Sequence, residues 1–319
     1  MDIFKRGLTC RPFLLSLALS LSCLVALQAI HATNGYRAVV AHVDGFIAAD
    51  SSGRIDWISM DAAVKKSVTL PATDLRCVLS TPQSIVVGGA KGSLFVSKND
   101  STFTRVNCGA DYTLHALAYF NNTVLIGSDQ GMLFLYDKQG TVSSIQLPLK
   151  GNIRSLCARA SDCFGVTDQG EIIHSTNGIE WTVFDFNEYY KGYYDASSFT
   201  RVASSGDRIF VSGTRKNGQP IVIFSSEGTI WVERTITYSN EQARVTTLEE
   251  PILDMTYDAY ADLFVLACTN GLLMTIPSCS HCNKGFYLTD DHLTGVAKNN
   301  ETFLIVGANG YRRTLMHEW

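Results

Sequence analysis

The 319-residue sequence has no sustained run of apolar residues at the 3.6-residue period of an amphipathic helix, so we expect little helix. It has no excess of positive charge either. The formal net charge is −4, which gives nucleic-acid binding no electrostatic support. Beyond residue 32, no segment is apolar enough to cross a membrane. The hydrophobic content of 46% instead favours a large folded core.

The first 32 residues carry the pattern of a secretory signal peptide. Three basic residues precede an apolar run from Phe13 to Leu27, and small residues suitable for cleavage follow at Ala29 and Ala32. A retained anchor is the alternative, although the run is short for a membrane span of roughly 20 residues. Residues 1–32 are therefore predicted to direct export, to the outside of the cell or to a periplasmic or lumenal compartment.

A short pattern recurs throughout residues 33–319, which we interpret as a single domain. In each copy an apolar run meets a glycine turn, and a second apolar run follows, as in "VTDQGEIIHS" from Val166. Successive turns are 47, 39, 39, 48, 53 and 39 residues apart. The turn glycines are Gly45, Gly92, Gly131, Gly170, Gly218, Gly271 and Gly310. Self-similarity at this spacing predicts a solenoid, a propeller or another repeat array.

Each copy can be divided into four short strands. In residues 73–107 the strands are "TDLRCVLS", "SIVVGG", "SLFVSK" and "FTRVN". Four-stranded units of about 40 residues are typical of propeller blades. We therefore predict an all-β, seven-bladed β-propeller with four-stranded antiparallel blades, and six or eight blades also fit the pattern. The first copy has no obvious first strand and the last no obvious fourth, so we expect an N-terminal strand to complete the final blade.

Two hairpins share a pattern of serine, a polar residue, glycine and tryptophan: "STNGIEW" ends at Trp181 and "SSEGTIW" at Trp231. "SSGRIDW", ending at Trp57, is a looser copy. The pattern resembles the Asp-box, or BNR, repeat of sialidase-type propellers, in particular the Ycf48-like proteins related to photosystem II assembly factors. Asn177 and Glu227 stand where that family has aspartate. The resemblance implies a propeller that binds proteins or assists assembly.

Aligning the first strands of six copies predicts a ring of polar residues at one level around the propeller axis. The ring comprises Arg76, His115, Arg154, Arg201, Asp254 and Thr294. One interpretation is a solvated channel lining or a set of salt bridges between blades. The other is a mostly basic ring that receives an anionic group or an acidic peptide.

Two connections, 186–198 and 237–251, are longer than the repeat requires, and long loops on rigid scaffolds commonly carry binding. The first contains Tyr189, Tyr190, Tyr193 and Tyr194, whose rings suit protein or sugar recognition. We expect these tyrosines and the arginines to form one composite site at the channel mouth. A loop folded back over its own blade is the alternative.

A sialidase would need a tyrosine nucleophile with a glutamate base, for which Glu188 beside the tyrosines is the nominal candidate. The arginine motif of that family is missing near the N-terminus, where only Tyr36-Arg37 is found. We therefore predict a non-enzymatic, monomeric protein-binding or assembly module without a cofactor or metal. Carbohydrate binding or sialidase-like glycoside hydrolysis is the alternative.

Seven cysteines follow the signal segment, so at least one has no partner within the chain. Cys157 and Cys163 flank a tight turn and are candidates for a disulfide. Cys279 and Cys282 could form a small-loop disulfide or remain thiols. A zinc site there would lack a second pair of ligands.

Overall fold

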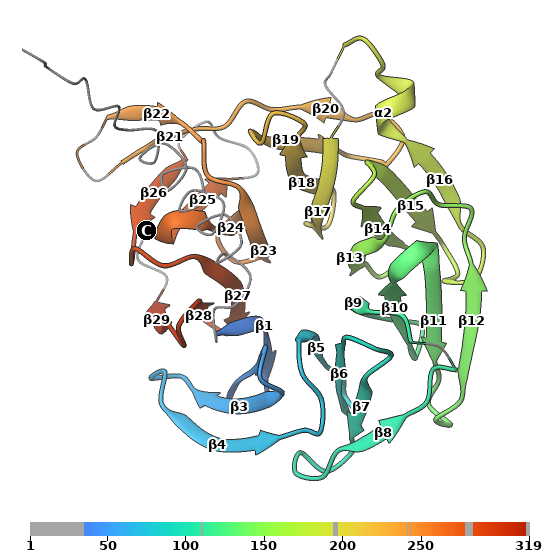
Figure 1. The fold of residues 1–319 in the computed structure, drawn as a ribbon. Coiled ribbons are helices and arrows are strands. Elements are labelled where there is room, and N and C mark those ends of the chain that lie inside the picture. Colours follow the sequence, from blue (N-terminus) through green and yellow to red (C-terminus); the bar gives the residue numbers. More distant parts are fainter. Residues whose placement is uncertain are drawn as a thin grey trace, which may run out of the picture. The chain divides into compact units, whose positions relative to one another are not determined.

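Seven sheets follow one another along the chain and surround a central axis (Figure 1). Their strands pair antiparallel, apart from one parallel bridge between Ser239 and Lys284 in the sixth sheet. The computed structural model describes residues 35–109, 111–193, 197–240, 242, 244–277 and 283–316. The prediction of an all-β, seven-bladed propeller with four-stranded antiparallel blades is confirmed. The segment predicted to be a signal peptide lies outside the described residues.

The first four blades each contain four strands in sequential order. Blade 1 is β1 (Tyr36–His42), β2 (Gly45–Asp50), β3 (Arg54–Ser59) and β4 (Val64–Thr69). Blade 2 is β5 (Leu75–Ser80), β6 (Ile85–Gly89), β7 (Leu94–Ser97) and β8 (Thr104–Val106). Blade 3 is β9 (Leu114–Phe120), β10 (Thr123–Ser128), the 3-10 turn η2 (Asp129–Gly131), β11 (Met132–Tyr136) and β12 (Val142–Gln146). Blade 4 is β13 (Ile153–Ala158), β14 (Cys163–Thr167), β15 (Glu171–Ser175) and β16 (Thr182–Asp185).

The remaining blades vary at their outer edges. Blade 5 is β17 (Ser197–Ser204), β18 (Ile209–Arg215), β19 (Pro220–Ser225) and β20 (Val232–Glu233). Blade 6 is β23 (Ile252–Asp258), β24 (Leu263–Cys268), the 3-10 turn η3 (Thr269–Gly271), β25 (Leu272–Pro277) and β26 (Lys284–Tyr287). The long connection before blade 6 forms β21 (Thr237–Ser239) and β22 (Val245–Thr247), which extend this sheet to six strands. Blade 7 has three strands among the described residues: β27 (Leu293–Asn299), β28 (Thr302–Gly307) and β29 (Arg312–Met316).

Helix is scarce, as expected from the absence of helical periodicity. The described part of the chain contains one short α-helix, α2 (Phe186–Tyr189), in the connection between blades 4 and 5. No helix in this part is long and apolar enough to span a membrane.

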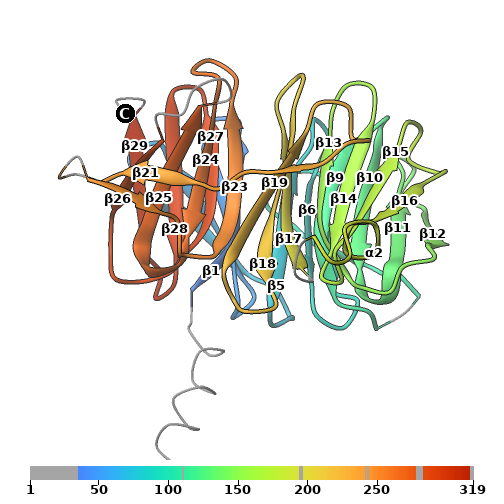
Figure 2. The same cartoon turned by 90° about the horizontal axis from the view of Figure 1, so that it is seen from above.

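The first strand of each blade lies innermost, and the first strands contact one another in sequence until β27 returns to β1. In side view the strands run across the thickness of the ring, so successive turns alternate between its two faces (Figure 2). The second strands, such as β2, β14 and β24, are buried along their whole length because neighbouring blades cover both sheet faces. This packing explains their nearly continuous apolar sequences.

The expectation that an N-terminal strand completes the last blade is wrong for the described residues, because β1 pairs with β2 inside blade 1. The error lies in the choice of turn glycine. Gly45 follows the turn between β1 and β2, whereas Gly53, with a φ of 94°, lies between β2 and β3. Gly53 precedes Gly92 by 39 residues, so the first repeat has the same length as the next two.

Blade 7 is joined to blade 1 by side-chain bonds to backbone carbonyls. The Thr294 hydroxyl donates to the carbonyl of Tyr36 at 2.6 Å. The Asn299 amide donates to the carbonyls of His42 and Gly45 at 2.8 and 2.7 Å. These bonds secure both ends of β1 against the last blade.

The hairpin ending at Trp181 is held by its own side chains. The Ser175 hydroxyl accepts the N–H of Gly178 at 2.8 Å, and the Asn177 side chain accepts two further turn N–H groups. Trp181 packs between blades 3 and 4, and Trp231 is buried between blades 4 and 5. Both tryptophans therefore support blade packing.

Cys157 and Cys163 are not disulfide-bonded, so that expectation is wrong. Cys163 pairs across the sheet with Ala158, the neighbour of Cys157, so the two thiols lie on opposite sheet faces. Cys157 contacts Ser204 in blade 5, whereas Cys163 packs in the cluster between blades 3 and 4. Cys279 and Cys282 lie outside the described residues.

We predict that deletion of residues 312–319 destabilises the whole ring. The deletion removes β29, which pairs with β28 along five residue positions, and leaves backbone groups of that buried strand unpaired. Each such group costs about 1–3 kcal/mol, so the melting temperature should fall by roughly 10 °C or more. Arg312→Ala, which removes only a bond to the Ala62 carbonyl, is the control and should have a small effect. A truncated protein that melts with the full-length chain would contradict this role for β29.

Candidate functional site

A β-bulge lies near the start of every innermost strand. In each blade one residue has no partner on the second strand, because the pairing register shifts there. A bulge bends the strand and re-aims the side chain of the extra residue. The bulged residues are Arg37, Arg76, His115, Arg154, Thr200, Leu253 and Thr294.

Six of the seven innermost strands line a cavity of about 180 Å³ at the end of the channel where these strands begin. We call it the arginine cavity, and it brings together five of the six ring residues expected from the sequence. These are Arg76, His115, Arg154, Arg201 and Asp254. The sixth, Thr294, does not line the cavity and is used in ring closure.

The alignment behind that expectation is off by one residue in two blades. Arg201 and Asp254 each follow the bulged residue and pair with the second strand, whereas Arg76, His115 and Arg154 occupy the bulge itself. Arg201 and Asp254 nevertheless line the same cavity.

Arg37 also lines the cavity and was missed as a site residue. The signal was present, because "YRAVV" matches "LRCVL" at the bulge. The sequence alignment omits Arg37 because it assigns no first strand to the first copy.

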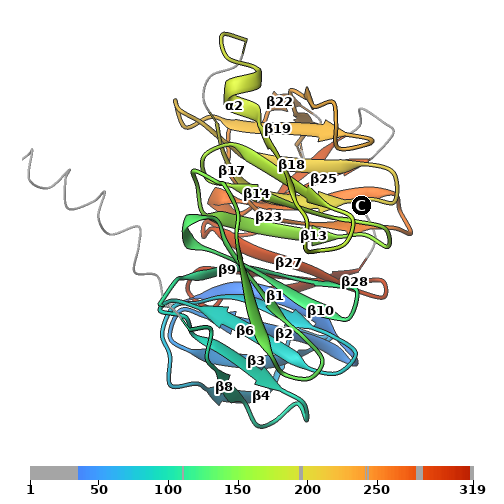
Figure 3. The same cartoon turned by 90° about the vertical axis from the view of Figure 1, so that its right-hand side faces the viewer.

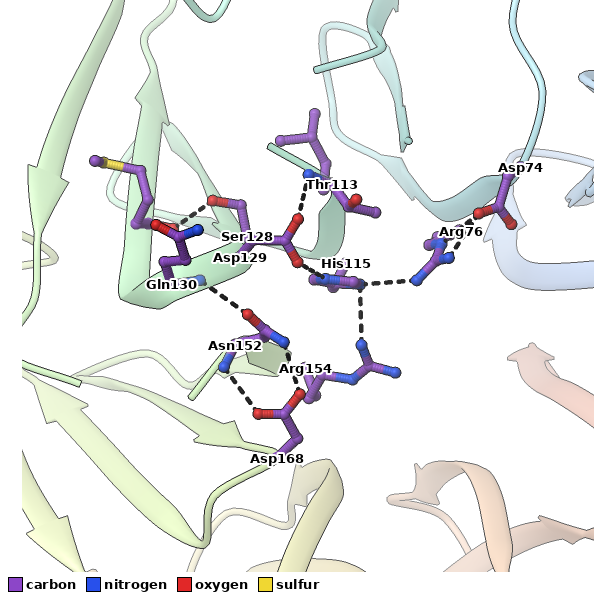
Figure 4. A network of polar contacts seen from close by, with 12 residues as sticks. Asp74, Arg76, Thr113, His115, Ser128, Asp129, Gln130, Asn152, Arg154 and Asp168 are labelled. Carbon is purple, nitrogen blue, oxygen red and sulfur yellow. Dashed lines mark hydrogen bonds and ion pairs between the residues drawn. The ribbon is translucent and has the colours of Figure 1, made fainter. Parts of the chain in front are cut away.

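His115 lies between two guanidinium groups (Figure 4). Its Nδ1 is 3.3 Å from Nη1 of both Arg76 and Arg154, and its Nε2 is 2.6 Å from Oδ1 of Asp129. A guanidinium only donates hydrogen bonds, so Nδ1 must accept and the ring proton must lie on Nε2, which donates to Asp129. His115 is therefore a neutral imidazole that holds two arginines side by side.

The surroundings keep this ring neutral. The side chain is only 6% exposed, and burial is the largest cause that lowers the pKa of His115 below its usual 6.5. The bond to Asp129 opposes this shift, but the charges of Arg154 and Arg76 add to it. Burial tends to raise the pKa of Asp129, yet the bonds from His115 and the Thr113 N–H outweigh it, so this carboxylate stays ionised.

Two of the cavity's arginines have carboxylate partners. Arg76 donates through Nε and Nη2 to the same oxygen of Asp74, at 2.8 and 2.6 Å. Arg201 donates through Nε to Asp254 at 3.0 Å, and the other oxygen of Asp254 accepts a backbone N–H. Burial raises the pKa of Asp254, and the charge of Arg201 opposes that shift.

Arg37 and Arg154 have no carboxylate within ion-pair distance among the described residues. The Nε of Arg37 is buried without a hydrogen-bond partner in this part of the chain. Burial lowers the pKa of Arg154, whose one hydrogen bond in the network of Figure 4 goes to neutral His115. The cavity therefore holds two cations without an ion-paired carboxylate, although the charges of Asp168 and Asp129 partly offset that of Arg154. An anion entering the cavity would supply the missing bonded partner.

The tyrosines do not share this cavity. Figures 1 and 3 place α2, which carries Tyr189, at the outer rim of the ring. Tyr190 packs on Phe186 and donates its hydroxyl to the carbonyl of Trp231 at 2.8 Å. Tyr189 and Tyr193 are 69% and 86% exposed. Since no tyrosine lines the arginine cavity among the described residues, the structure does not join the two groups. Tyr194 lies outside those residues.

The cavity offers charge and hydrogen-bond donors. Asp254, which is ion-paired with Arg201, is the one carboxylate in the part of the lining that the structure describes. Nothing in its described lining forms a pair of tyrosine nucleophile and glutamate base. The described residues contain no group of three or more histidine, cysteine, aspartate or glutamate side chains placed to hold a metal ion. The arrangement is suited to binding an acceptor-only anion.

Comparison with known proteins gives information about the fold and none about the function. No protein-family model matches this sequence, and no curated protein sequence matches it. The crystal structure of the computationally designed Ika8 protein is similar, with a TM-score of 0.61. The match covers 89% of this chain and 97% of that one at 12% identity. Such low identity shows a shared fold without implying a shared function.

We predict that the pKa of His115, followed by NMR of its ring signals, lies below 6.5. Arg154→Ala should raise this pKa because it removes a neighbouring positive charge, and Asp129→Asn should lower it because it removes the stabilising carboxylate. The unfolded chain binds the proton at higher pH than the folded protein. The stability due to the neutral ring is therefore complete above about pH 6.5 and is lost as the pH falls toward the folded-state pKa. A value above 6.5 would mean that Asp129 holds an imidazolium.

Proposed function

We propose that the protein is an exported, non-enzymatic β-propeller that binds a protein partner by receiving an acidic group of that partner in the arginine cavity. The observation that carries the proposal is that Arg37 and Arg154 lie in a partly enclosed space without an ion-paired carboxylate among the described residues. A carboxylate entering this space would accept charge-assisted hydrogen bonds and relieve the repulsion between the guanidinium groups.

The rigidity of the scaffold favours this role. The backbone that carries Arg76, His115 and Arg154 belongs to packed innermost strands, so binding would order little of the protein. A preorganised site loses less conformational entropy on binding than a flexible loop does. The exposed Tyr189 and Tyr193 at the rim are available for contacts of their own.

The resemblance to Asp-box propellers of the Ycf48-like type supports the same proposal. The hydrogen bonds made by Ser175 and Asn177 are those expected of such a hairpin, with asparagine taking the part of aspartate. By that resemblance, the partner would be a protein undergoing assembly in the compartment to which the chain is exported.

A sialidase-like hydrolase is the less favoured function, because the candidate tyrosines and Glu188 lie at or near α2 and the arginines line the channel. Carbohydrate binding without hydrolysis would need a polar and aromatic lining, and the described lining of the arginine cavity contains no aromatic ring other than that of His115. An acidic peptide fits this lining better.

We predict that Arg37→Ala combined with Arg154→Ala weakens partner binding by about 10- to 100-fold and reduces its salt dependence, since bonds to charged groups contribute about 1.5–3 kcal/mol. The measurement is a pull-down from the native compartment at several salt concentrations. Melting should be nearly unchanged, because neither arginine forms an ion pair within the described fold.

The control is Arg105→Ala with Arg244→Ala, which removes two exposed charges away from the cavity. If this pair weakens binding as much as the cavity pair does, the effect comes from net charge. The cavity would then not be the site.

A further inference from the structure

We infer that the arginine cavity binds a carboxylate together with a proton, and that His115 takes up this proton. The inference rests on the proposed function, because it concerns the same cavity and specifies how its ligand is held. It makes binding tighter at lower pH, through a reciprocal linkage between ligand and proton.

In the free protein, His115 cannot be protonated at Nδ1 without moving its neighbours. Both Arg76 and Arg154 point an Nη1 donor at this nitrogen from 3.3 Å (Figure 4). A proton there would set three N–H donors against one another and place three positive charges side by side. The two hydrogen bonds to Nδ1 also use one guanidinium donor each of Arg76 and Arg154, which are then not directed at a ligand.

A bound carboxylate reverses both conditions. It accepts hydrogen bonds only, so the Nη1 groups of Arg76 and Arg154 gain a charged acceptor in place of a neutral ring nitrogen. When they turn to it, Nδ1 of His115 loses its donors and takes a proton from solvent. The new N–H is then a further donor for the carboxylate. No covalent bond to carbon forms or breaks, and one proton moves from water to the ring.

On the Nε2 side of the ring, a negative charge is already in place to stabilise an imidazolium. Asp129 already accepts the Nε2 proton at 2.6 Å and stays ionised. The charged groups that face the ring or share its cavity are Arg76 on β5 with its partner Asp74, Arg154 on β13 with Asp168 nearby, Asp129 on the η2 turn, Arg37 on β1, and Arg201 on β17 with its partner Asp254 on β23. His115 is the only cavity group among these whose ordinary pKa lies near neutrality.

The test is calorimetric titration of the whole protein with N-acetyl-tetraglutamate amide between pH 5.5 and 7.5, in two buffers of different ionisation enthalpy. Tetraglutamine of the same form is the uncharged control. A third peptide with a free C-terminus and glutamine side chains distinguishes a terminal carboxylate from side-chain carboxylates. We expect uptake approaching one proton per carboxylate bound, with affinity rising up to about tenfold per pH unit as the pH falls through the window.

His115→Gln is the decisive variant, because an amide can accept from the arginines and donate to Asp129 but does not titrate. It should bind the peptide with no proton uptake and with a flat pH dependence. His174→Gln removes another histidine beside an aspartate, outside the cavity, and should behave as the unaltered protein does. Asp129→Asn should move the uptake to lower pH, which supplies a second test if His115→Gln melts early.

Binding by the unaltered protein without proton uptake would overturn this inference and leave the proposed function standing. Uptake that persists in His115→Gln would overturn it as well. If neither acidic peptide binds at any pH, both the inference and the proposed acidic ligand are wrong.

Discussion

Closure of the ring between blades 7 and 1 is the contact on which the rest of the structure depends. A propeller blade has two apolar faces, and each needs a neighbouring blade to cover it. The last interface buries Tyr36 and Phe46 of blade 1 against Leu304 and Val306 of blade 7. Gly295 allows the close approach, since a Cβ at that position would meet Val39 Cγ1 at 3.0 Å. An open ring would leave both faces in water.

Closure also determines what happens at the axis. Because the innermost strands contact one another around the ring, polar side chains near the starts of six of them share a narrow common space, four of these side chains being bulged residues. Four arginines in that space would repel strongly in a low dielectric. Asp74 and Asp254 offset two of the charges, and neutral His115 separates the side chains of two arginines. Arg37 and Arg154 still have no ion-paired carboxylate among the described residues, although Asp168 and Asp129 partly offset Arg154. Arginines without a bonded carboxylate in a partly enclosed space are an arrangement that binding sites often share.

The blades could be predicted from the sequence because a glycine turn recurs between two apolar runs every 39 to 53 residues. The first strand was missed because Gly45 and Gly53 both follow polar residues and only one of them lies between the second and third strands. Arg76 and Arg154 could be aligned because their blades share one length and one bulge. Arg201 was placed in the same ring but one residue away from the bulge, which lies at Thr200 in its blade. The position of the tyrosines could not be predicted from the sequence, because the spacing of the repeats does not determine how far a connection lies from the propeller axis.

The carboxylates of the turns between second and third strands join the fold to the site. These turns look alike in sequence, and local turn chemistry alone accounts for an aspartate before their glycine. In the structure they also hold the neighbouring innermost strand. Asp129 accepts the N–H of Thr113 at 2.7 Å, and Asp168 accepts the N–H of Asn152 at 2.9 Å, each just before the residues that enter the arginine cavity. The innermost strands that carry His115 and Arg154 are therefore held by the packing of neighbouring blades and, just before each strand begins, by these carboxylates. A ligand would then have to reorient only guanidinium groups, so most of the attraction between its charge and theirs would remain as affinity.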